Sequence, residues 1–202
     1  MNRCKAFKKI EKRLGLPALK AKQVESVKSL LNRKDTFVIA GPGFGKSAIY
    51  QTAALMDETR LTLVIEPTLS LIQDQVNRLR SLPDPVLAEY MTSTNIDDHN
   101  QIINKIKDKA LTVLFVTPER LQKSAFQKAI KHNEPALIVV DECHLVLDWG
   151  ETFRQDYLRI GAFVDSLHER PTILTMTATA PMEDRSQIIF SLFVIFSCQQ
   201  AM

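Results

Sequence analysis

The segment from residue 40 to residue 47 combines residue types that bind phosphate groups. It reads Ala40-Gly41-Pro42-Gly43-Phe44-Gly45-Lys46-Ser47 and is followed by Ala48, with Ala40 where the strict pattern has Gly. Glycines let backbone N–H groups turn toward phosphate oxygens, and a helix N-terminus behind the loop adds unpaired N–H groups. Lys46 can reach the β- and γ-phosphates, and the Ser47 hydroxyl can ligate Mg²⁺. The segment predicts a nucleotide-phosphate loop; the alternative is a glycine-rich turn with a solvated lysine.

Two adjacent carboxylates could supply the second half of a hydrolytic site. Asp141 and Glu142 directly follow the apolar run 137–140, which is typical of a buried strand. At such a strand end Asp141 is placed to hold Mg²⁺ through water, and Glu142 to orient or deprotonate an attacking water. The alternative is a pair of exposed loop acids, which the phosphate loop earlier in the chain disfavours. His144, taken alone, is typical of a packed or capping histidine.

Short apolar runs rich in β-branched residues alternate with amphipathic stretches. The runs predict strands over Thr36–Ala40, Leu61–Ile65, Val86–Met91, Leu111–Val116, Ala136–Val140 and Thr172–Met176. The stretches predict helices over Ala48–Met56, Ser70–Ser81, Asp97–Lys107, Gln122–Asn133 and Tyr157–Glu169. This alternation favours an α/β fold with a mostly parallel sheet and helices on both faces. Ligands of such sheets bind beyond the carboxyl ends of the strands, so the polar strand ends should meet at one rim.

The charge of the chain is unevenly distributed. Its 202 residues are 45% hydrophobic and 24% charged, with a formal net charge of +3, which suits one globular domain with a sizeable core. Residues 1–34, however, carry 11 Lys/Arg and 2 Asp/Glu. This basic segment either meets phosphate backbones or forms a solvated charged helix, and its composition alone favours neither.

Cysteine usage and hydropathy favour an intracellular protein that does not enter a membrane. Cys4, Cys143 and Cys198 have neither metal-ligand nor redox spacing, which suggests a reducing setting. No apolar signal-peptide core precedes the first expected helix. The apolar run Ile188–Phe196 is too short to span a bilayer, so we expect it to form a core-facing helix or strand.

The order of the motifs resembles that of the RecQ family of superfamily 2 DNA helicases. Asp141-Glu142-Cys143-His144 looks like the DExH box of that superfamily, and Leu14-Gly15 with Lys20 and Gln23 resembles the family's adenine-recognition motif. The stretch 63–76 is similar to the family segment SPLISLMxDQV. Further matches are Gly45-Lys46-Ser47 with Tyr50-Gln51, Thr117–Leu121 (the PERL element), the aromatic-rich loop Trp149–Tyr157 and Thr177–Ala180 (the TATA motif). The resemblance extends from about residue 14 to about residue 185, nearly the whole chain.

This resemblance implies a RecA-like P-loop NTPase domain that uses ATP and Mg²⁺, with a role for each matched residue. Gln23 and Lys20 would recognise adenine, residues 41–48 would bind the phosphates, and Ser47 and Asp141 would hold Mg²⁺. Lys46, Asp141, Glu142 and His144 would be catalytic. The residues that would contact nucleic acid or link domains are Thr68, Ser70, Arg120, Trp149, Phe153, Arg154 and Thr179. Singly, such residues also suit caps or turns, and Ser70 and Thr117 are plausible helix caps.

The resemblance also implies an organisation and a function. We expect a basic helical segment over 1–34, a helicase ATP-binding domain over 35–185 and an apolar tail over 186–202. The expected function is that of the ATP-binding lobe of a 3′–5′ DNA helicase, acting on single-stranded or partially duplex DNA in the nucleus or the bacterial cytoplasm. A second RecA-like lobe or a full-length helicase would be its protein partner, and alone it should be weakly active. The alternatives are a regulatory nucleic-acid-binding fragment and an RNA-directed ATPase.

Overall fold

The computed structural model describes residues 3–143 and 159–178 of the chain. The expected tail over 186–202, including the apolar run 188–196, lies outside the described residues. None of the described helices combines the length and the hydrophobicity that crossing a membrane requires.

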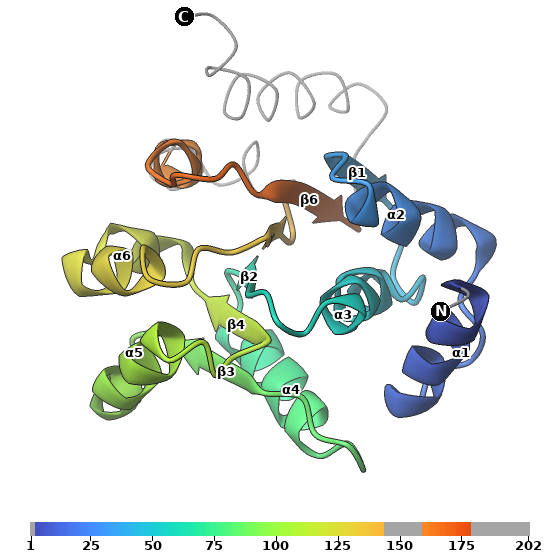
Figure 1. Cartoon of the computed structure of the whole chain (residues 1–202), viewed down its shortest axis with the longest axis horizontal. Helices are drawn as coiled ribbons and strands as arrows, with labels where there is room; N and C mark the ends of the chain where they lie inside the picture. The colour runs from blue at the N-terminus through green and yellow to red at the C-terminus, as the bar shows by residue number, and fades with distance from the viewer. Residues whose placement is uncertain (1–2, 144–158, 179–202) are drawn as a thin grey trace, which may run out of the picture.

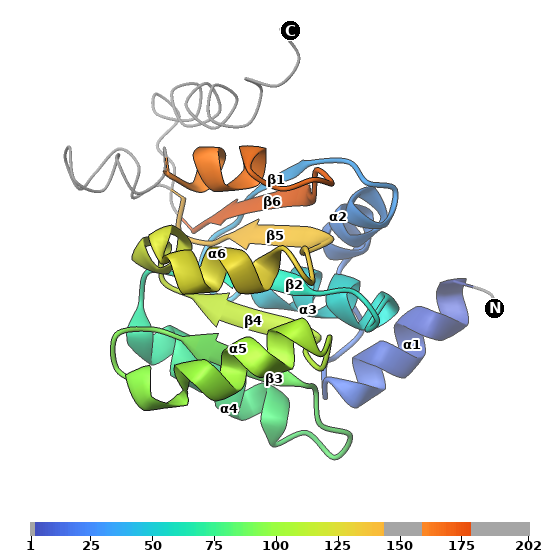
Figure 2. The same cartoon turned by 60° about the vertical axis from the view of Figure 1, so that its left-hand side comes forward.

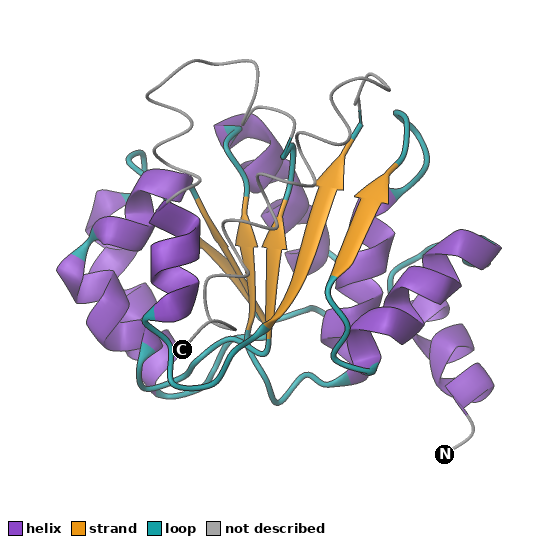
Figure 3. Cartoon of the chain, turned by 90° about the horizontal axis from the view of Figure 1, so that it is seen from above, coloured by secondary structure: helices purple, strands orange, loops and turns teal. Residues whose placement is uncertain are grey.

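Six short strands form one sheet in which every described pairing is parallel. Their spatial order is β1-β6-β5-β2-β4-β3. The strands are β1 (Thr36–Ile39), β2 (Thr62–Ile65), β3 (Ala88–Met91), β4 (Val113–Val116), β5 (Leu137–Val140) and β6 (Thr172–Thr177). Figure 3 shows the arrows pointing the same way, so that the loops after the strands gather at one rim. The predicted α/β class with a parallel sheet is confirmed.

Helices fill the crossovers between these strands and cover both faces of the sheet (Figure 1). The α-helices are α1 (Arg3–Arg13), α2 (Ala21–Leu31), α3 (Lys46–Met56), α4 (Leu69–Arg80), α5 (His99–Lys107) and α6 (Ser124–Ile130), with 3₁₀ turns η1 (Ile96–Asp98) and η2 (Pro118–Gln122). Residues 159–165 are also helical. Side chains from α1–α4 form one core cluster, and side chains from α5, α6 and 159–165 form the other. Figure 2 shows the sheet between these two layers.

Alternation along the strands explains why both faces are apolar. Leu63 and Ile65 of β2 belong to the cluster with α5 and α6, whereas Val64 belongs to the cluster with α3 and α4. All four residues of β2, β4 and β5 are buried. Strands buried on both faces are continuous apolar runs in the sequence, which is why they could be predicted.

The bounds of several elements differ from expectation. Four strands begin one or two residues later than predicted, because apolar residues such as Leu61 and Leu111 are buried before the ladder begins. Helix α6 is shorter than the predicted helix over 122–133, since Lys123 is extended (φ −74°, ψ 119°) and a turn closes at Asn133. A 3₁₀ turn precedes α5, and α4 lies one residue earlier than predicted.

The basic N-terminal segment forms two helices that pack on the domain. Phe7, Ile10 and Leu14, with Val27 and Leu30 of α2, lie in the same core cluster as α3. Lys8, Lys9 and Lys12 of α1 are exposed. The segment is therefore amphipathic: its apolar side docks against the domain, and its lysines face solvent.

Candidate nucleotide site

The loop over 40–45 connects β1 to α3 and turns sharply at two glycines. Gly43 has φ +74° and Gly45 has φ +84°, which is the left-handed region that favours glycine. Gly45 is the N-cap of α3, and the Ala40 N–H donates to the Thr177 carbonyl at the end of β6 (3.1 Å). The loop is thereby attached to the sheet at its start and to a helix N-terminus at its end, which is the geometry of an anion site.

Lys46, Ser47 and Ala48 form the first turn of α3. The Lys46 ammonium donates to the Ala40 carbonyl across the loop (3.2 Å), and the Lys46 and Ser47 side chains are half-buried. Ala48 is buried, and its N–H donates to the Gly45 carbonyl (3.1 Å). The cation and the hydroxyl that phosphates and Mg²⁺ would require therefore lie side by side at the helix start.

Helix α2 holds the loop from outside through Gln23. Its side-chain amide donates to the carbonyls of Phe44 (2.9 Å) and Gly45 (3.0 Å), while its oxygen accepts the Lys20 N–H (2.8 Å). The Lys20 ammonium also donates to the Phe44 carbonyl and lies 4.9 Å from the centre of the Phe44 ring. The two residues predicted to recognise adenine therefore both contact the phosphate loop.

Asp141 and Glu142 follow β5 at the same rim as the loop. The Asp141 N–H donates to the Ile65 carbonyl (3.0 Å), and the Glu142 N–H donates to the Asp141 carboxylate (2.9 Å). Glu142 has φ +48°, an uncommon value for a residue with a side chain, and both carboxylates are half-buried. Only β6 separates β5 from β1 in the sheet, so the carboxylates and the loop lie on the same rim with one strand between them.

The residues present fit a magnesium nucleotide. A Cβ at Gly45 would lie 2.8 Å from the Gln23 amide nitrogen, so a side chain there would displace the amide that holds the loop. No group of three His, Cys, Asp or Glu side chains among residues 3–143 and 159–178 could hold a metal by itself. Mg²⁺ at nucleotide sites takes only one or two protein ligands and completes its shell with phosphate oxygens and water. Ser47 and Asp141 could be these one or two protein ligands.

A third carboxylate, that of Glu66, lies at this rim and was not among the predicted site residues. It follows β2 and is only 5% exposed. Burial, together with the charge of Asp141, raises the pKa of Glu66 to about 7, against the opposing effect of the hydrogen bond from the Thr68 N–H (3.0 Å). An acid directly after an apolar strand was the available signal, because the carboxyl ends of parallel strands converge.

The residues predicted to contact nucleic acid lie on this rim where the structure describes them. Thr68 and Ser70 are exposed at the start of α4, and Arg120 in η2 donates to the Thr92 carbonyl (3.0 Å). The N-cap of α4 is Thr68, so the prediction of Ser70 as a cap is wrong, whereas Thr117 is the N-cap of η2 as predicted. His144, Trp149, Phe153, Arg154 and Thr179 lie outside the described residues.

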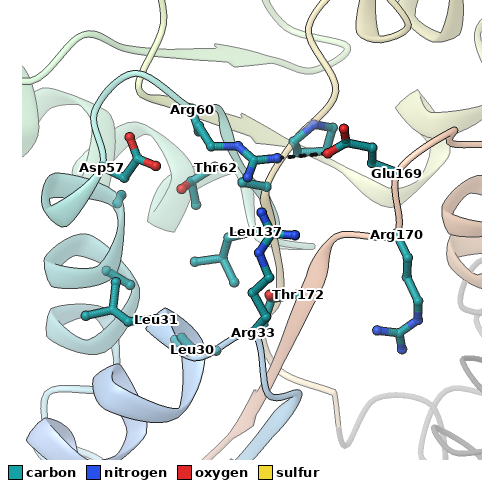
Figure 4. A pocket seen from close by; sticks show the side chains of 14 residues that line it. Leu30, Leu31, Arg33, Asp57, Arg60, Thr62, Leu137, Glu169, Arg170 and Thr172 are labelled. Atoms are coloured by element: carbon teal, nitrogen blue, oxygen red, sulfur yellow. Dashed lines mark hydrogen bonds and ion pairs between the residues drawn. The ribbon is translucent and has the colours of Figure 1, made fainter.

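A cavity of about 420 Å³ lies at the end of the sheet opposite the rim, where the strands begin (Figure 4). Its lining includes Thr62, Leu137 and Thr172, at the amino ends of β2, β5 and β6. Arg60 and Glu169, which both line it, form an ion pair (3.3 Å), drawn as a dashed line in Figure 4. This cavity is therefore remote from the phosphate loop and the carboxylates.

Known proteins resemble the chain over most of its length. The family model of DEAD/DEAH box helicases matches residues 20–188. The ATP-dependent DNA helicase RecQ of Pasteurella multocida is 35% identical over 176 residues, which are 87% of this chain and 27% of that protein. RecQ of Bacillus subtilis is 33% identical, over 89% of this chain and 30% of that protein. The chain thus spans less than a third of the length of these relatives.

Solved structures support the fold. The crystal structure of the Pyrococcus furiosus Hef helicase domain superposes with a TM-score of 0.64 at 19% identity, over 86% of this chain and 36% of that one. At this identity the likeness concerns the fold alone, which is RecA-like.

Proposed function

Because the chain belongs to the DEAD/DEAH box helicase family, we propose that it is the ATP-binding lobe of a RecQ-like 3′–5′ DNA helicase. In this proposal it binds ATP with Mg²⁺ and hydrolyses the nucleotide in response to a DNA strand. Its site of action would be the compartment that holds the DNA, the nucleus in a eukaryote and the cytoplasm in a bacterium.

One observation carries this proposal: the phosphate loop and the carboxylate pair occupy one rim with a single strand between them. Lys46 would neutralise phosphate charge, and the Ser47 hydroxyl with Asp141 would hold the metal. The metal supplies charge neutralisation at the transferred phosphoryl group. Glu142 would accept a proton from the attacking water, and the N–H groups of the loop would orient the phosphates.

The choice of DNA as the substrate rests on the relatives, and the rim supports contacts to a nucleic-acid backbone. The matched RecQ proteins are named DNA helicases. Exposed hydroxyls of Thr68 and Ser70 at a helix start suit contacts to a phosphate backbone. A strand bound there would lie beside the carboxylates. Such proximity would let strand binding influence hydrolysis.

An ATPase assay on the 202-residue chain, with and without a matching second lobe, tests the proposal. We expect single-stranded DNA to stimulate hydrolysis when the second lobe is present, and Lys46→Ala to abolish it. Lys22→Ala, which changes an exposed lysine of α2, is the matched control and should remain active. If the chain bound no ATP either alone or with the second lobe, the proposal would be refuted. Equal stimulation of ATP hydrolysis by RNA and by DNA would favour the RNA-directed alternative.

A further inference from the structure

The cavity of about 420 Å³ lies where the strands of the sheet begin and where α2 and α3 end. Thr62, Leu137 and Thr172 stand opposite one another in the register of β2, β5 and β6. Side chains in such a row point to the same face of the sheet, and all three line the cavity. Leu30 of α2 and Ala54 of α3 line it as well. Its volume lies within the range of about 300–1,000 Å³ that is typical of small-molecule sites.

The lining combines an apolar surface with polar groups. Leu137, in the middle of the row, and Leu30 are 6% and 5% exposed, so they contribute a largely buried carbon surface. Thr62 and Thr172 flank Leu137 on either side, and each brings a hydroxyl group. Such a lining can hold a carbon skeleton and orient it through its polar groups.

Three arginines line the cavity, and carboxylates of the fold pair with two of them. Arg60 pairs with Glu169 (3.3 Å), and Arg170 donates to both carboxylate oxygens of Asp35 (2.6 Å and 3.3 Å). Within residues 3–143 and 159–178, the Arg33 guanidinium has no hydrogen bond, ion pair or ring contact. Arg33 therefore lacks the carboxylate partner that the other two arginines have.

The backbone of Arg33 is held at the end of α2. Its φ of +56° lies in the left-handed region that favours glycine. The Arg33 N–H donates to the Leu30 carbonyl (2.9 Å) and the Lys34 N–H to the Ser29 carbonyl (3.0 Å), the pair of bonds that commonly ends a helix at a glycine. Figure 4 shows the Arg33 side chain extending from there toward Leu137. These bonds fix the point from which the guanidinium reaches the cavity.

We propose that this cavity binds a small organic carboxylate and that Arg33 anchors the carboxylate group. The fork of a guanidinium matches a carboxylate through two parallel hydrogen bonds, as Arg170 and Asp35 do within the fold. The body of the ligand, aromatic or branched aliphatic, packs on Leu30 and Leu137. The ligand thus supplies the partner that the fold does not give to Arg33.

A ligand with one negative charge suits this cavity better than a phosphate dianion. Helices α2 and α3 both end beside it, and the C-terminal carbonyls of a helix carry partial negative charge. Asp57 and Glu169 add carboxylates to the lining. The Arg33 guanidinium can therefore balance one further carboxylate, whereas a second negative charge would be repelled.

The cavity is separate from the nucleotide site. Helix α3 begins at the phosphate loop with Lys46, and the residue that follows its last turn, Asp57, lines the cavity at the other end. A carboxylate bound there needs neither a nucleotide nor a DNA strand, so this inference does not rest on the proposed function.

NMR titration of the isotope-labelled 202-residue chain with benzoate and with 4-methylpentanoate tests the site. We expect the backbone amide signals of residues 30–33 and 54–57 to shift and saturate, with a Kd of about 1 mM for these small carboxylates. Benzamide and 4-methylpentanamide are the neutral matches and should bind about tenfold more weakly, because they carry no charge. Phenyl phosphate at pH 8 brings a dianion and should also bind more weakly than benzoate.

Arg33→Gly removes the anchor and relieves the left-handed backbone, so this variant should fold. Lys109→Gly is the matched control: Lys109 is exposed, has φ +55° just after α5, and is not among the residues that line the cavity. We expect Arg33→Gly to raise the Kd for benzoate about tenfold, and Lys109→Gly to leave it within about twofold of wild type. Thermal melts establish that both variants are folded.

Binding of benzoate by Arg33→Gly with the wild-type Kd would overturn the inference. So would a failure of both carboxylates to saturate the signals at about tenfold the expected Kd, or tighter binding of the amides or of phenyl phosphate. A non-hydrolysable ATP analogue with Mg²⁺ should not displace benzoate, and displacement would overturn the assignment to this cavity. If benzoate bound and the chain bound no ATP, the proposed function would fail and the carboxylate site would stand.

Discussion

The Gln23 amide nitrogen lies 3.0 Å from the Gly45 carbonyl oxygen and would lie 2.8 Å from a Cβ at Gly45. This contact joins the helix that precedes the sheet to the tightest point of the phosphate loop. It means that the loop conformation depends both on the absence of a side chain at Gly45 and on the presence of one at Gln23.

Gly45→Ala should destabilise the protein and weaken nucleotide binding. The φ of +84° is unfavourable for alanine, and the new methyl group would push the Gln23 amide off its two carbonyl acceptors. We expect a loss of about 1–3 kcal/mol in the free energy of unfolding, measured by urea denaturation. Gly41→Ala is the control, because no atom lies within 4 Å of a Cβ there. Equal stability of the two variants would contradict this account.

Gln75→Ala should cost more than its position on the surface helix α4 suggests. The Gln51 amide, at 1% exposure in α3, donates to the Gln75 side-chain oxygen (2.8 Å). Truncating Gln75 leaves this buried donor without its acceptor, which costs about 1–3 kcal/mol. Gln73→Ala, at an exposed position of the same helix, should change stability by less than about 0.5 kcal/mol. Thermal or urea unfolding of both variants decides the matter.

Glu66 should make the nucleotide-free protein less stable as the pH rises. The pKa of Glu66 is about 7 in the fold, raised from its ordinary value of 4.5, because burial and the charge of Asp141 disfavour the ionised form. The folded state therefore binds more protons between these two values. The contribution of Glu66 to the free energy of unfolding should therefore be largest below pH 4.5 and should decrease as the pH rises to about 7.

The size of that pH effect follows from the shift of 4.5 to about 7, which amounts to about 3 kcal/mol for a single group. Urea unfolding in EDTA at pH 5 and pH 8 measures it, as the difference between wild type and Glu66→Gln. We expect the free energy of unfolding of Glu66→Gln, relative to that of wild type, to be higher at pH 8 than at pH 5. A difference between the two proteins that stays constant over this range would contradict the raised pKa of Glu66.

Cys143 should resist alkylation in the native protein. It is a free thiol with 0% exposure, and burial together with the charges of Asp141 and Glu142 raises its pKa to about 12. Since the thiolate is the reactive form, iodoacetamide at pH 8 should leave this residue unmodified until urea unfolds the chain. Peptide mass mapping follows Cys143 separately from the other cysteines. Rapid native labelling at Cys143 would indicate that the rim opens.

The features predicted well are those in which short-range sequence and long-range packing agree. The apolar runs of β2, β4 and β5 could be identified because both sheet faces are buried. The strand–loop–helix around Lys46 could be identified because glycine spacing restricts it to few conformations. The N-terminal helices show the contrary case, since their lysine content hid the apolar side formed by Phe7 and Ile10.

The features that could not be predicted depend on residues brought together from distant segments. Nothing local to Gln23 shows that its amide bonds to Phe44 and Gly45 rather than to solvent. The proximity of Glu66 and Asp141 requires the strand order, in which β5 is inserted beside β2. The sequence also could not show that β2 begins at Thr62 and β4 at Val113. Hydropathy indicates which residues are buried, but not where hydrogen bonding between strands begins.

The strand that leads into the phosphate loop pairs only with β6 among the described strands. Where these two strands begin, the Ile173 N–H donates a hydrogen bond to the Asp35 carboxylate, and these two residues are 138 positions apart in the sequence. A ribosome that adds about 5–20 residues per second needs about 7–28 s to synthesise such a length. During that interval β1 has no neighbouring strand, so the nascent chain cannot complete its nucleotide site. Protection of β1 by chaperones, or by α2 docking early, would then decide how much of the protein reaches its native state.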